Sequence, residues 1–381
     1  MVHHPVGIRS IAVSFPSIIR TNDYYREKYP ELVAQSEQKS LAKLFSLADS
    51  TPRNEFDLEM MPYLSDPFRG TVQRRILDPG ESSLTLEERA ARDALDAANL
   101  TPDDVDLMIV ASVWPEQIGF GNAAFLAQKL GLQGAAWNLD GACGVTQVAL
   151  QTACALVRTG EYRNVLVVIS CTYSRFVDED DTVSWFLGDG AGAFVVGSLE
   201  YNQGILSTKT VHTSVLNDIV CLKMTEDRQG NPRIRMKLDK DAKKVFSEAA
   251  VGLLHTCCEG AVAAAGLSLE QIDFFLFNTA TAWFASFATR VLGIDPERTL
   301  NLYPQYANIG PVLTVANLYH AARLGKIREN NLVLVYGFGA AGAASANVMR
   351  WSNVTLGPAP ISEPELIGKS SFDSSLILSR N

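Results

Sequence analysis

The chain has 381 residues, of which 47% are hydrophobic and 20% charged, and its formal net charge is −9 at pH 7. This is the composition of an ordinary globular protein with room for two domain-sized units. The acidic balance argues against nucleic acid or an anionic membrane as the main partner. No apolar run reaches transmembrane length and the first residues lack the pattern of a secretory signal, so we expect a cytoplasmic protein.

The cysteines and histidines show no metal-ligand pattern. The six cysteines are scattered, and the adjacent pair Cys257 and Cys258 lies inside a helical pattern. The five histidines form no HExxH or paired-ligand arrangement. We therefore expect reduced thiols and no metal.

One supersecondary unit occurs twice along the chain. Its matched strands, first half before second, are residues 106–111 and 273–278, 164–169 and 331–335, and 190–196 and 342–348. Strands that alternate with helices in a repeated order predict an α/β protein of two similar halves. We expect an N-terminal half at residues 1–200, with an inserted helical or loop segment around residues 22–75 on one side of the site. The second half is expected at residues 201–381, with a surface tail from Asn353 onward.

Cys143 lies where a short apolar run turns into a predicted helix. The run before it is Ala135–Leu139, and helical spacing follows over Val145–Arg158. The first turn of a helix has unpaired N–H groups, and their partial positive charge favours a thiolate over a thiol. The position therefore suits a cysteine that holds an acyl group as a thioester. The alternative is a small buried cysteine, as most free cysteines are.

The repeat gives Cys143 a counterpart in the second half. Cys143 and Asn308 lie the same number of residues before a matched glycine, Gly160 and Gly325 respectively. Asn278 ends its matched strand, and the carboxyl ends of strands are where open α/β sheets place ligands. If the halves pack about a pseudo-twofold axis, Cys143, Asn308 and Asn278 should meet at one site.

Four motifs in this order resemble β-ketoacyl-acyl-carrier-protein synthase III and its relatives in the thiolase superfamily. They are residues 140–145 (DGACGV), 186–193 (FLGDGAGA), 307–310 (ANIG) and 337–342 (GFGAAG), and residues 70–75 (GTVQRR) resemble an early signature of that family. The resemblance implies the thiolase fold, a five-layered α-β-α-β-α sandwich from two βαβαβαββ halves, and a homodimer. It also implies acyl thioester chemistry at Cys143, with acyl-CoA or a phosphopantetheine-acyl-carrier protein as substrate and no bound cofactor.

One position departs from the family pattern. Members that make carbon–carbon bonds usually carry a histidine in a His-Gln-Ala-Asn motif, where this chain has Asn278 within residues 277–281 (FNTAT). The family's catalytic asparagine is retained as Asn308. The resemblance also implies an oxyanion hole from the backbone N–H groups of Cys143 and Ala340, with Ala340 in place of a family glycine. No counterpart of the residues that clamp the adenine of coenzyme A can be placed, which favours a carrier-protein donor.

Three functions stay open. The first is an acyltransferase, as relatives of secondary metabolism with altered triads often are, that moves an acyl group from Cys143 to a carrier-protein thiol, an amine or a hydroxyl. The second is decarboxylative Claisen condensation, in which Asn278 and Asn308 would hold the thioester oxygen. The third is a non-catalytic partner subunit, against which the retained Cys143 counts. The loop 114–120 is a candidate for closing a partner's acyl pocket, or for ordinary interface packing.

Overall fold

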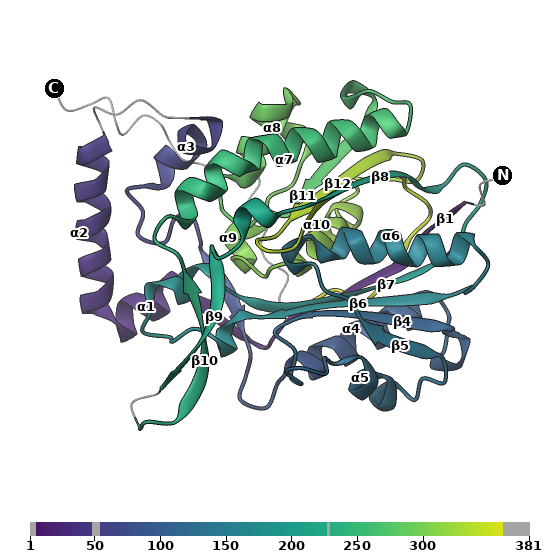
Figure 1. Ribbon diagram of the computed structural model, residues 1–381, viewed down its shortest axis with the longest axis horizontal. Helices are drawn as coiled ribbons and strands as arrows, with labels where there is room; N and C mark the ends of the chain where they lie inside the picture. The colour runs from purple at the N-terminus through teal and green to yellow at the C-terminus, as the bar shows by residue number, and fades with distance from the viewer. Residues whose placement is uncertain (1–4, 48–53, 227–228, 361–381) are drawn as a thin grey trace.

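The computed structural model describes residues 5–47, 54–226 and 229–360. Two mixed β-sheets organise these residues (Figure 1). The first sheet contains, in spatial order, β14 (Thr355–Leu356), β1 (Val6–Ser14), β7 (Asp189–Ser198), β6 (Val165–Thr172), β4 (Leu107–Val113) and β5 (Ala135–Asn138). The second contains β11 (Phe274–Phe277), β12 (Leu332–Phe338), β13 (Ala343–Arg350) and β8 (Gly204–His212).

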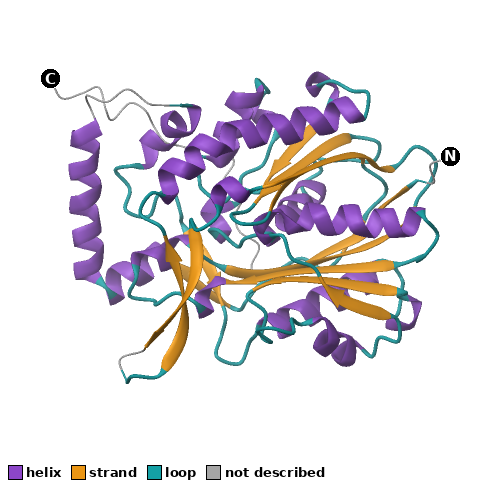
Figure 2. Ribbon diagram, viewed as in Figure 1, coloured by secondary structure: helices purple, strands orange, loops and turns teal. Residues whose placement is uncertain are grey.

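Helices complete five layers, which Figure 2 shows stacked from top to bottom. The outer helices are α7 (Ala242–Ala264) and α8 (Phe284–Leu292) over the second sheet, and α4 (Ser83–Ala97) and α5 (Ala123–Leu130) under the first. Between the sheets lie α6 (Val145–Arg158) and α10 (Val312–Arg323). The central strands are apolar on both faces because helices cover both, and β6 is buried along its whole length. The predicted thiolase fold is confirmed.

The two halves share one order of elements. The first runs β1, α4, β4, α5, β5, α6, β6, β7, and the second runs β8, α7, β11, α8, α10, β12, β13. The partner of β5 is reduced in the second half to a single parallel bridge between Phe275 and Thr299. At the C-terminal end, β14 returns to pair with β1 of the first sheet. The domain boundary near residue 200 stays a prediction.

The described residues of the region 22–75 are mainly helical. It contains α1 (Asn22–Lys28), α2 (Pro30–Leu47) and α3 (Glu55–Met60), and ends in β3 (Gln73–Ile76), which pairs with β2 (Ile18–Thr21). Phe56 of α3 packs edge-on against Trp283 and Phe287 of the second half. The region thus covers α8, close to the end of β11. The remaining elements are the short α9 (Tyr303–Tyr306) and a hairpin of β9 (Val220–Glu226) and β10 (Pro232–Leu238).

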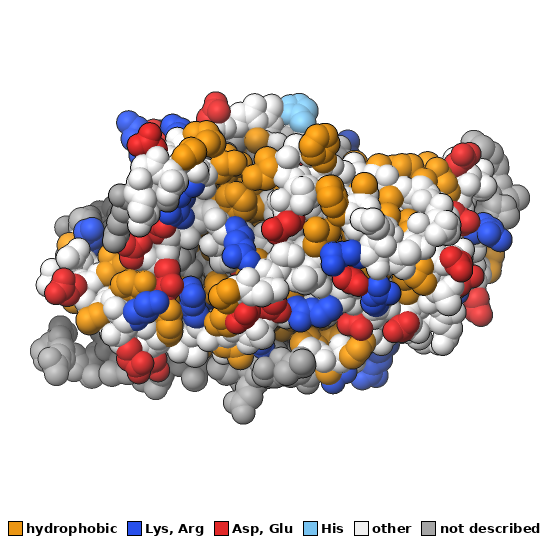
Figure 3. All heavy atoms as spheres, turned by 90° about the horizontal axis from the view of Figure 1, so that it is seen from below, with side chains coloured by type: hydrophobic (Ala, Val, Ile, Leu, Met, Phe, Trp, Pro, Cys, Tyr) orange, Lys and Arg blue, Asp and Glu red, His pale blue; other side chains and the backbone are white. Residues whose placement is uncertain are grey.

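The next features concern the charges on the surface, the length of the helices and the state of the cysteines. In the view of Figure 3, acidic and basic side chains are interspersed over the face. None of the described helices is long and apolar enough to cross a membrane. All six cysteines lie among the described residues and are free thiols, and Cys257 and Cys258 are buried in α7.

A carboxyl group is buried under the first sheet. Glu87 of α4 is fully buried and accepts hydrogen bonds from the Ser112 and Ser170 hydroxyls at 2.5 Å each and from the Asn122 amide at 2.9 and 3.0 Å. Burial raises its pKa to about 7 in spite of these donors. Asn122 also accepts from the backbone N–H of Gln117, so the network supports the start of the loop after β4.

Because of Glu87, the free energy of unfolding should decrease as the pH rises from 4.5 to about 7. Its pKa is higher in the folded state than the ordinary 4.5, so between pH 4.5 and about 7 the folded chain holds a proton that the unfolded chain has lost. The free energy of unfolding should drop by roughly 3 kcal/mol across that window from this group. Glu87→Gln removes the titration, so its urea unfolding curves from pH 4.5 to 7.5 should lose this part of the slope. Parallel pH profiles for the two proteins would contradict the assignment.

Candidate active site

Cys143 lies in a turn between β5 and α6. The 3₁₀ turn η3 (Ala142–Gly144) leads directly into α6. The Asp140 carboxylate accepts the backbone N–H groups of Gly141 and Ala142 at 2.7 and 3.3 Å and so fixes the turn before the cysteine. A Cβ at Gly144 would lie 2.1 Å from the carbonyl oxygen of Ala343, so the glycine after Cys143 is required by close approach of the second sheet. Cys143 itself is partly exposed.

Asn308 occupies the matched turn before α10. Its backbone N–H donates to the Phe186 carbonyl at 2.9 Å, and its carbonyl accepts from the Gly188 N–H at 3.0 Å. These two bonds join Asn308 to the FLGDGAGA segment. Its side-chain Oδ1 accepts the N–H of Gly310 at 2.8 Å. Asp189 of the same segment accepts backbone N–H groups, from Leu77 at 2.8 Å among others, as expected of a structural carboxylate.

Asn278 ties the two turns together. It follows β11 and is almost completely buried. Its amide Nδ2 donates to the carbonyl of Cys143 at 3.2 Å and to that of Gly310 at 3.1 Å. Because Gly310 in turn donates to Asn308, one chain of hydrogen bonds connects Cys143, Asn278 and Asn308. The Oδ1 atom of Asn278 is buried with no hydrogen-bond partner among the described residues.

The turn that contains Ala340 packs against the Cys143 backbone. A Cβ at Gly339 would lie 2.3 Å from the Cys143 backbone nitrogen. Ala340 is the next residue in the chain, so its backbone starts beside the Cys143 N–H group. Ala340 is partly exposed. The structure therefore brings all four predicted site residues to one place, while their catalytic roles stay a prediction.

Backbone strain concentrates around this place. Among the described non-glycine residues with positive φ, five are neither Asn nor Asp: Arg69, Trp114, Ala142, Ala307 and Ala341. Two of them directly precede Cys143 and Asn308, with φ of 51° and 56°. Cys143 and Asn308 therefore occupy equivalent positions in the two halves, as their equal spacing from the matched glycines predicted. Alanine in the left-handed region is strained, and such strain is typical of functional turns.

Tyr173 is a site residue that the sequence did not reveal. Its hydroxyl lies 3.5 Å from the Cys143 Sγ, and its side chain is buried. Although the residue as a whole is partly exposed, desolvation of its sulfur raises the pKa of the Cys143 thiol above its usual value, and the hydrogen bond with Tyr173 opposes that rise. From the sequence we expected only the helix N-terminus to act on the thiol, in the direction of ionisation. No sequence pattern indicates Tyr173, because it follows β6 whereas Cys143 lies in η3, and only the folded structure brings the two side chains together.

The described histidines have other partners. His320 is buried and hydrogen-bonds the Tyr306 hydroxyl at 3.0 Å, and His255 on α7 pairs with Glu259 at 2.7 Å. His212 is exposed and contacts the Ser214 hydroxyl at 2.9 Å. No cluster of His, Cys, Asp or Glu among the described residues could hold a metal ion.

Comparison with known proteins decides the family. The model of 3-oxoacyl-[acyl-carrier-protein] synthase III matches residues 138–213, and the model of its C-terminal part matches residues 262–351. A β-ketoacyl-[acyl-carrier-protein] synthase III from Chelativorans sp. is 31% identical over 304 residues, 77% of this chain and 94% of the relative. The chain belongs to the β-ketoacyl-[acyl-carrier-protein] synthase III family. A family member from Caldanaerobacter subterraneus is 29% identical over 309 residues, 78% of this chain and 93% of its own.

Solved structures of a synthase III and of OleA share the fold. That from Thermus thermophilus matches with a TM-score of 0.71 and 25% identity over 91% of this chain and 99% of its own. OleA from Xanthomonas campestris matches with a TM-score of 0.73 and 20% identity over 92% and 99% of the two chains. The synthase III family thus accounts for both halves of the fold and for the order of the motifs around Cys143.

Proposed function

We propose that the protein is an acyltransferase in which Cys143 accepts an acyl group and passes it to a separate acceptor. The donor is an acyl-CoA or an acyl-carrier-protein thioester, and the acceptor is a carrier-protein thiol, an amine or a hydroxyl. One observation favours transfer over condensation. The Asn278 amide donates to the carbonyls of Cys143 and Gly310 and is therefore not free to hold an enolate oxygen.

In the first half-reaction the Cys143 thiolate attacks the thioester carbonyl. The S–C bond to the acyl carbon forms, the C–S bond to the carrier thiol breaks, and the leaving thiolate takes a proton from water. The backbone N–H groups of Cys143 and Ala340 would hold the oxyanion, because Gly339 sets that turn against the cysteine nitrogen. A single such donor typically contributes about 3 kcal/mol to the transition state.

The second half-reaction depends on the acceptor. An asparagine cannot take up a proton near neutral pH, so Asn278 cannot serve as a general base. The loss of a positioned base costs on the order of 10²–10⁴ in rate for an acceptor that must be deprotonated. The site therefore suits acceptors that arrive nucleophilic, such as a carrier-protein thiolate or a weakly basic amine.

Decarboxylative condensation is the second candidate. The names of the relatives favour it, since the Chelativorans protein at 31% identity is a β-ketoacyl synthase. The side-chain Oδ1 of Asn308 is used by Gly310, which leaves its amide group to hold a malonyl thioester oxygen.

Product analysis separates the two functions. The purified protein is incubated with an acyl-CoA or acyl-carrier protein and with either malonyl-carrier protein or a panel of thiols and amines. Transfer predicts acylated acceptor without carbon dioxide, and carbon dioxide release that depends on Cys143 would overturn it. Turnover by the purified chain alone also tests the third candidate, a silent subunit, which predicts none.

A homodimer fits the surface beside the site. β5 is an edge strand that pairs only with β4 among the described strands, and an unpaired edge is a ready surface for a second chain. Near it, the Phe120 side chain of the loop after β4 is 83% exposed, and Ile118 is 61% exposed. Burial of such side chains by a second copy is the expected use of that loop. Sedimentation equilibrium should give twice the chain mass, and a monomer at micromolar concentration would contradict the dimer.

A further inference from the structure

The Tyr173 hydroxyl is the side-chain group that reaches the reacting atom of the site. It lies 3.5 Å from the Cys143 Sγ, and no other side chain of the described residues hydrogen-bonds that sulfur. The Asn278 amide is used by two backbone carbonyls, and the Asn308 Oδ1 accepts from Gly310. The two asparagines therefore shape the backbone around Cys143, whereas Tyr173 touches its sulfur.

Tyr173 is held in place from both sides along the chain. It begins the 3₁₀ turn η4 (Tyr173–Arg175). On one side the Thr172 hydroxyl donates to the Trp114 carbonyl at 3.0 Å. On the other side Ser174 donates to the Asp189 carboxylate from its N–H at 2.9 Å and from its hydroxyl at 2.5 Å.

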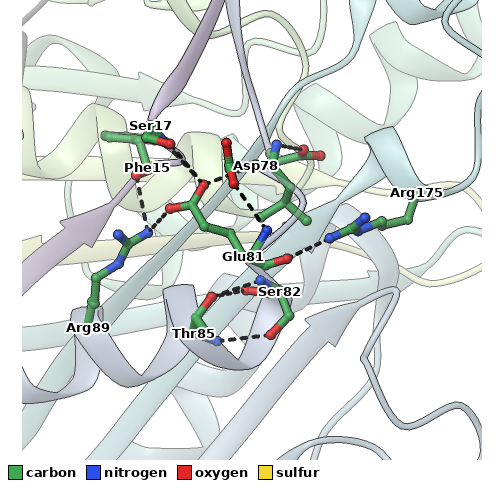
Figure 4. A network of polar contacts seen from close by, with 11 residues as sticks. Phe15, Ser17, Asp78, Glu81, Ser82, Thr85, Arg89 and Arg175 are labelled. Carbon is green, nitrogen blue, oxygen red and sulfur yellow. Dashed lines mark hydrogen bonds and ion pairs between the residues drawn. The ribbon is translucent and has the colours of Figure 1, made fainter.

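Two further contacts fix the end of η4. Arg175 donates to the carbonyl of Glu81, which lies just before α4 (Figure 4). The Glu81 carboxylate in turn accepts from Arg89 of α4 at 2.8 Å. The Phe176 ring packs on Trp114 with ring centroids 4.8 Å apart. The phenol thus sits on a fixed segment, as a group that must meet a reactive atom requires.

The space around the hydroxyl is set by a glycine. A Cβ at Gly310 would lie 3.3 Å from the Tyr173 oxygen and 2.9 Å from the Cys171 sulfur. Gly310 has φ of +57°, which other residues rarely adopt. Position 310 therefore leaves room for the phenol beside the two thiols, while its backbone binds both asparagines.

We propose that Tyr173 is a further catalytic residue: its hydroxyl donates a hydrogen bond to the Cys143 sulfur and stabilises the thiolate that attacks the acyl thioester. The phenol keeps its own proton throughout. A hydrogen bond to an ionised acceptor is about twice as strong as one to a neutral acceptor, so the contact favours the thiolate over the thiol. Burial also raises the pKa of Tyr173 well above its usual value, which keeps it a donor.

Two other titratable groups face this pair. Cys171 on β6 hydrogen-bonds Tyr173, and burial raises its pKa well above the usual value. Asp189 at the start of β7 lies close to Cys171, and burial raises its pKa to about 6. Because the pKa of Asp189 is about 6, its titration falls below the pH range in which Cys143 ionises.

The test is the alkylation rate of Cys143 by iodoacetamide from pH 7 to pH 11, read from the mass of the Cys143 peptide. Tyr173→Phe should raise the apparent pKa of Cys143 by about one unit and slow alkylation at pH 7.5 about tenfold. Tyr336→Phe is the matched control, because Tyr336 is also fully buried and its hydroxyl has no hydrogen-bond partner among the described residues. It should leave the Cys143 titration unchanged.

An unchanged titration in folded Tyr173→Phe protein would overturn the proposal. Should that variant fail to fold, Tyr173→Met fills the space with a flexible chain that lacks the hydroxyl and should give the same shift. The proposal rests on the acyl-transfer role of Cys143, but alkylation measures the thiol alone. A wild-type protein that takes up no acyl group would contradict the proposed function, whereas an unshifted titration would contradict only the role of Tyr173.

Discussion

Replacing Cys143 by alanine is expected to lower acyl transfer by roughly 10³-fold or more, because the acyl group then has no sulfur to bind. The turn should survive the change. Asp140 fixes it through backbone N–H groups, and Gly144 allows the approach of the second sheet. Thermal unfolding of Cys143→Ala should therefore stay close to that of the wild type. Initial rates with an acyl-CoA and an acceptor thiol measure the loss.

Cys221→Ala is the matched control for this prediction. Cys221 is the other cysteine that is partly exposed, and it lies on the β9–β10 hairpin. Its replacement should leave the rate unchanged. Full activity in Cys143→Ala, or an equal loss in Cys221→Ala, would show that the nucleophile lies elsewhere.

The second large effect is expected from Gly339→Ala. The new Cβ would lie 2.3 Å from the Cys143 nitrogen and 2.7 Å from the Ala142 Cβ, so one of the two turns has to move. Overpacking of this kind costs roughly 1–3 kcal/mol of stability. Displacement of one oxyanion donor lowers the acylation rate by about 10²–10³-fold. Single-turnover acylation and urea unfolding measure the two effects separately.

Gly252→Ala provides the comparison for Gly339→Ala. Gly252 lies in the middle of α7, and a Cβ there meets nothing within 4 Å. Alanine at an exposed helix position is favoured over glycine by about 0.5–1 kcal/mol, so this variant should be slightly more stable and equally active. Normal acylation by Gly339→Ala would contradict the placement of the Ala340 turn against the cysteine.

Much of the fold follows from patterns that the sequence carries locally. Each matched strand is a short apolar run, and α6 begins and ends at the residues that helical spacing predicts. The matched glycines located Asn308 opposite Cys143, and both positions prove to follow a strained alanine. The repeat made it possible to locate Asn308, because each element of one half can be compared with its counterpart in the other.

The fine structure of the site could not be predicted in the same way. In the condensation alternative Asn278 would hold a substrate oxygen, and in the structure its amide binds the backbone carbonyls of Cys143 and Gly310. Tyr173 gave no signal because its meeting with Cys143 depends on how β6 and η3 pack. Hydrogen-bond partners of this kind are set by tertiary packing, which spacing along one chain does not record.

The most direct test is to map the acyl group on the protein. Wild-type protein is exposed to acyl-CoAs and acyl-carrier proteins, quenched in acid and digested, and each cysteine peptide is weighed. The acyl mass should appear on the peptide that contains Cys143 and on no other. It should disappear when an acceptor thiol is added before the quench. No adduct with any donor, or an adduct on Cys221 alone, would contradict the assignment of Cys143 as the nucleophile.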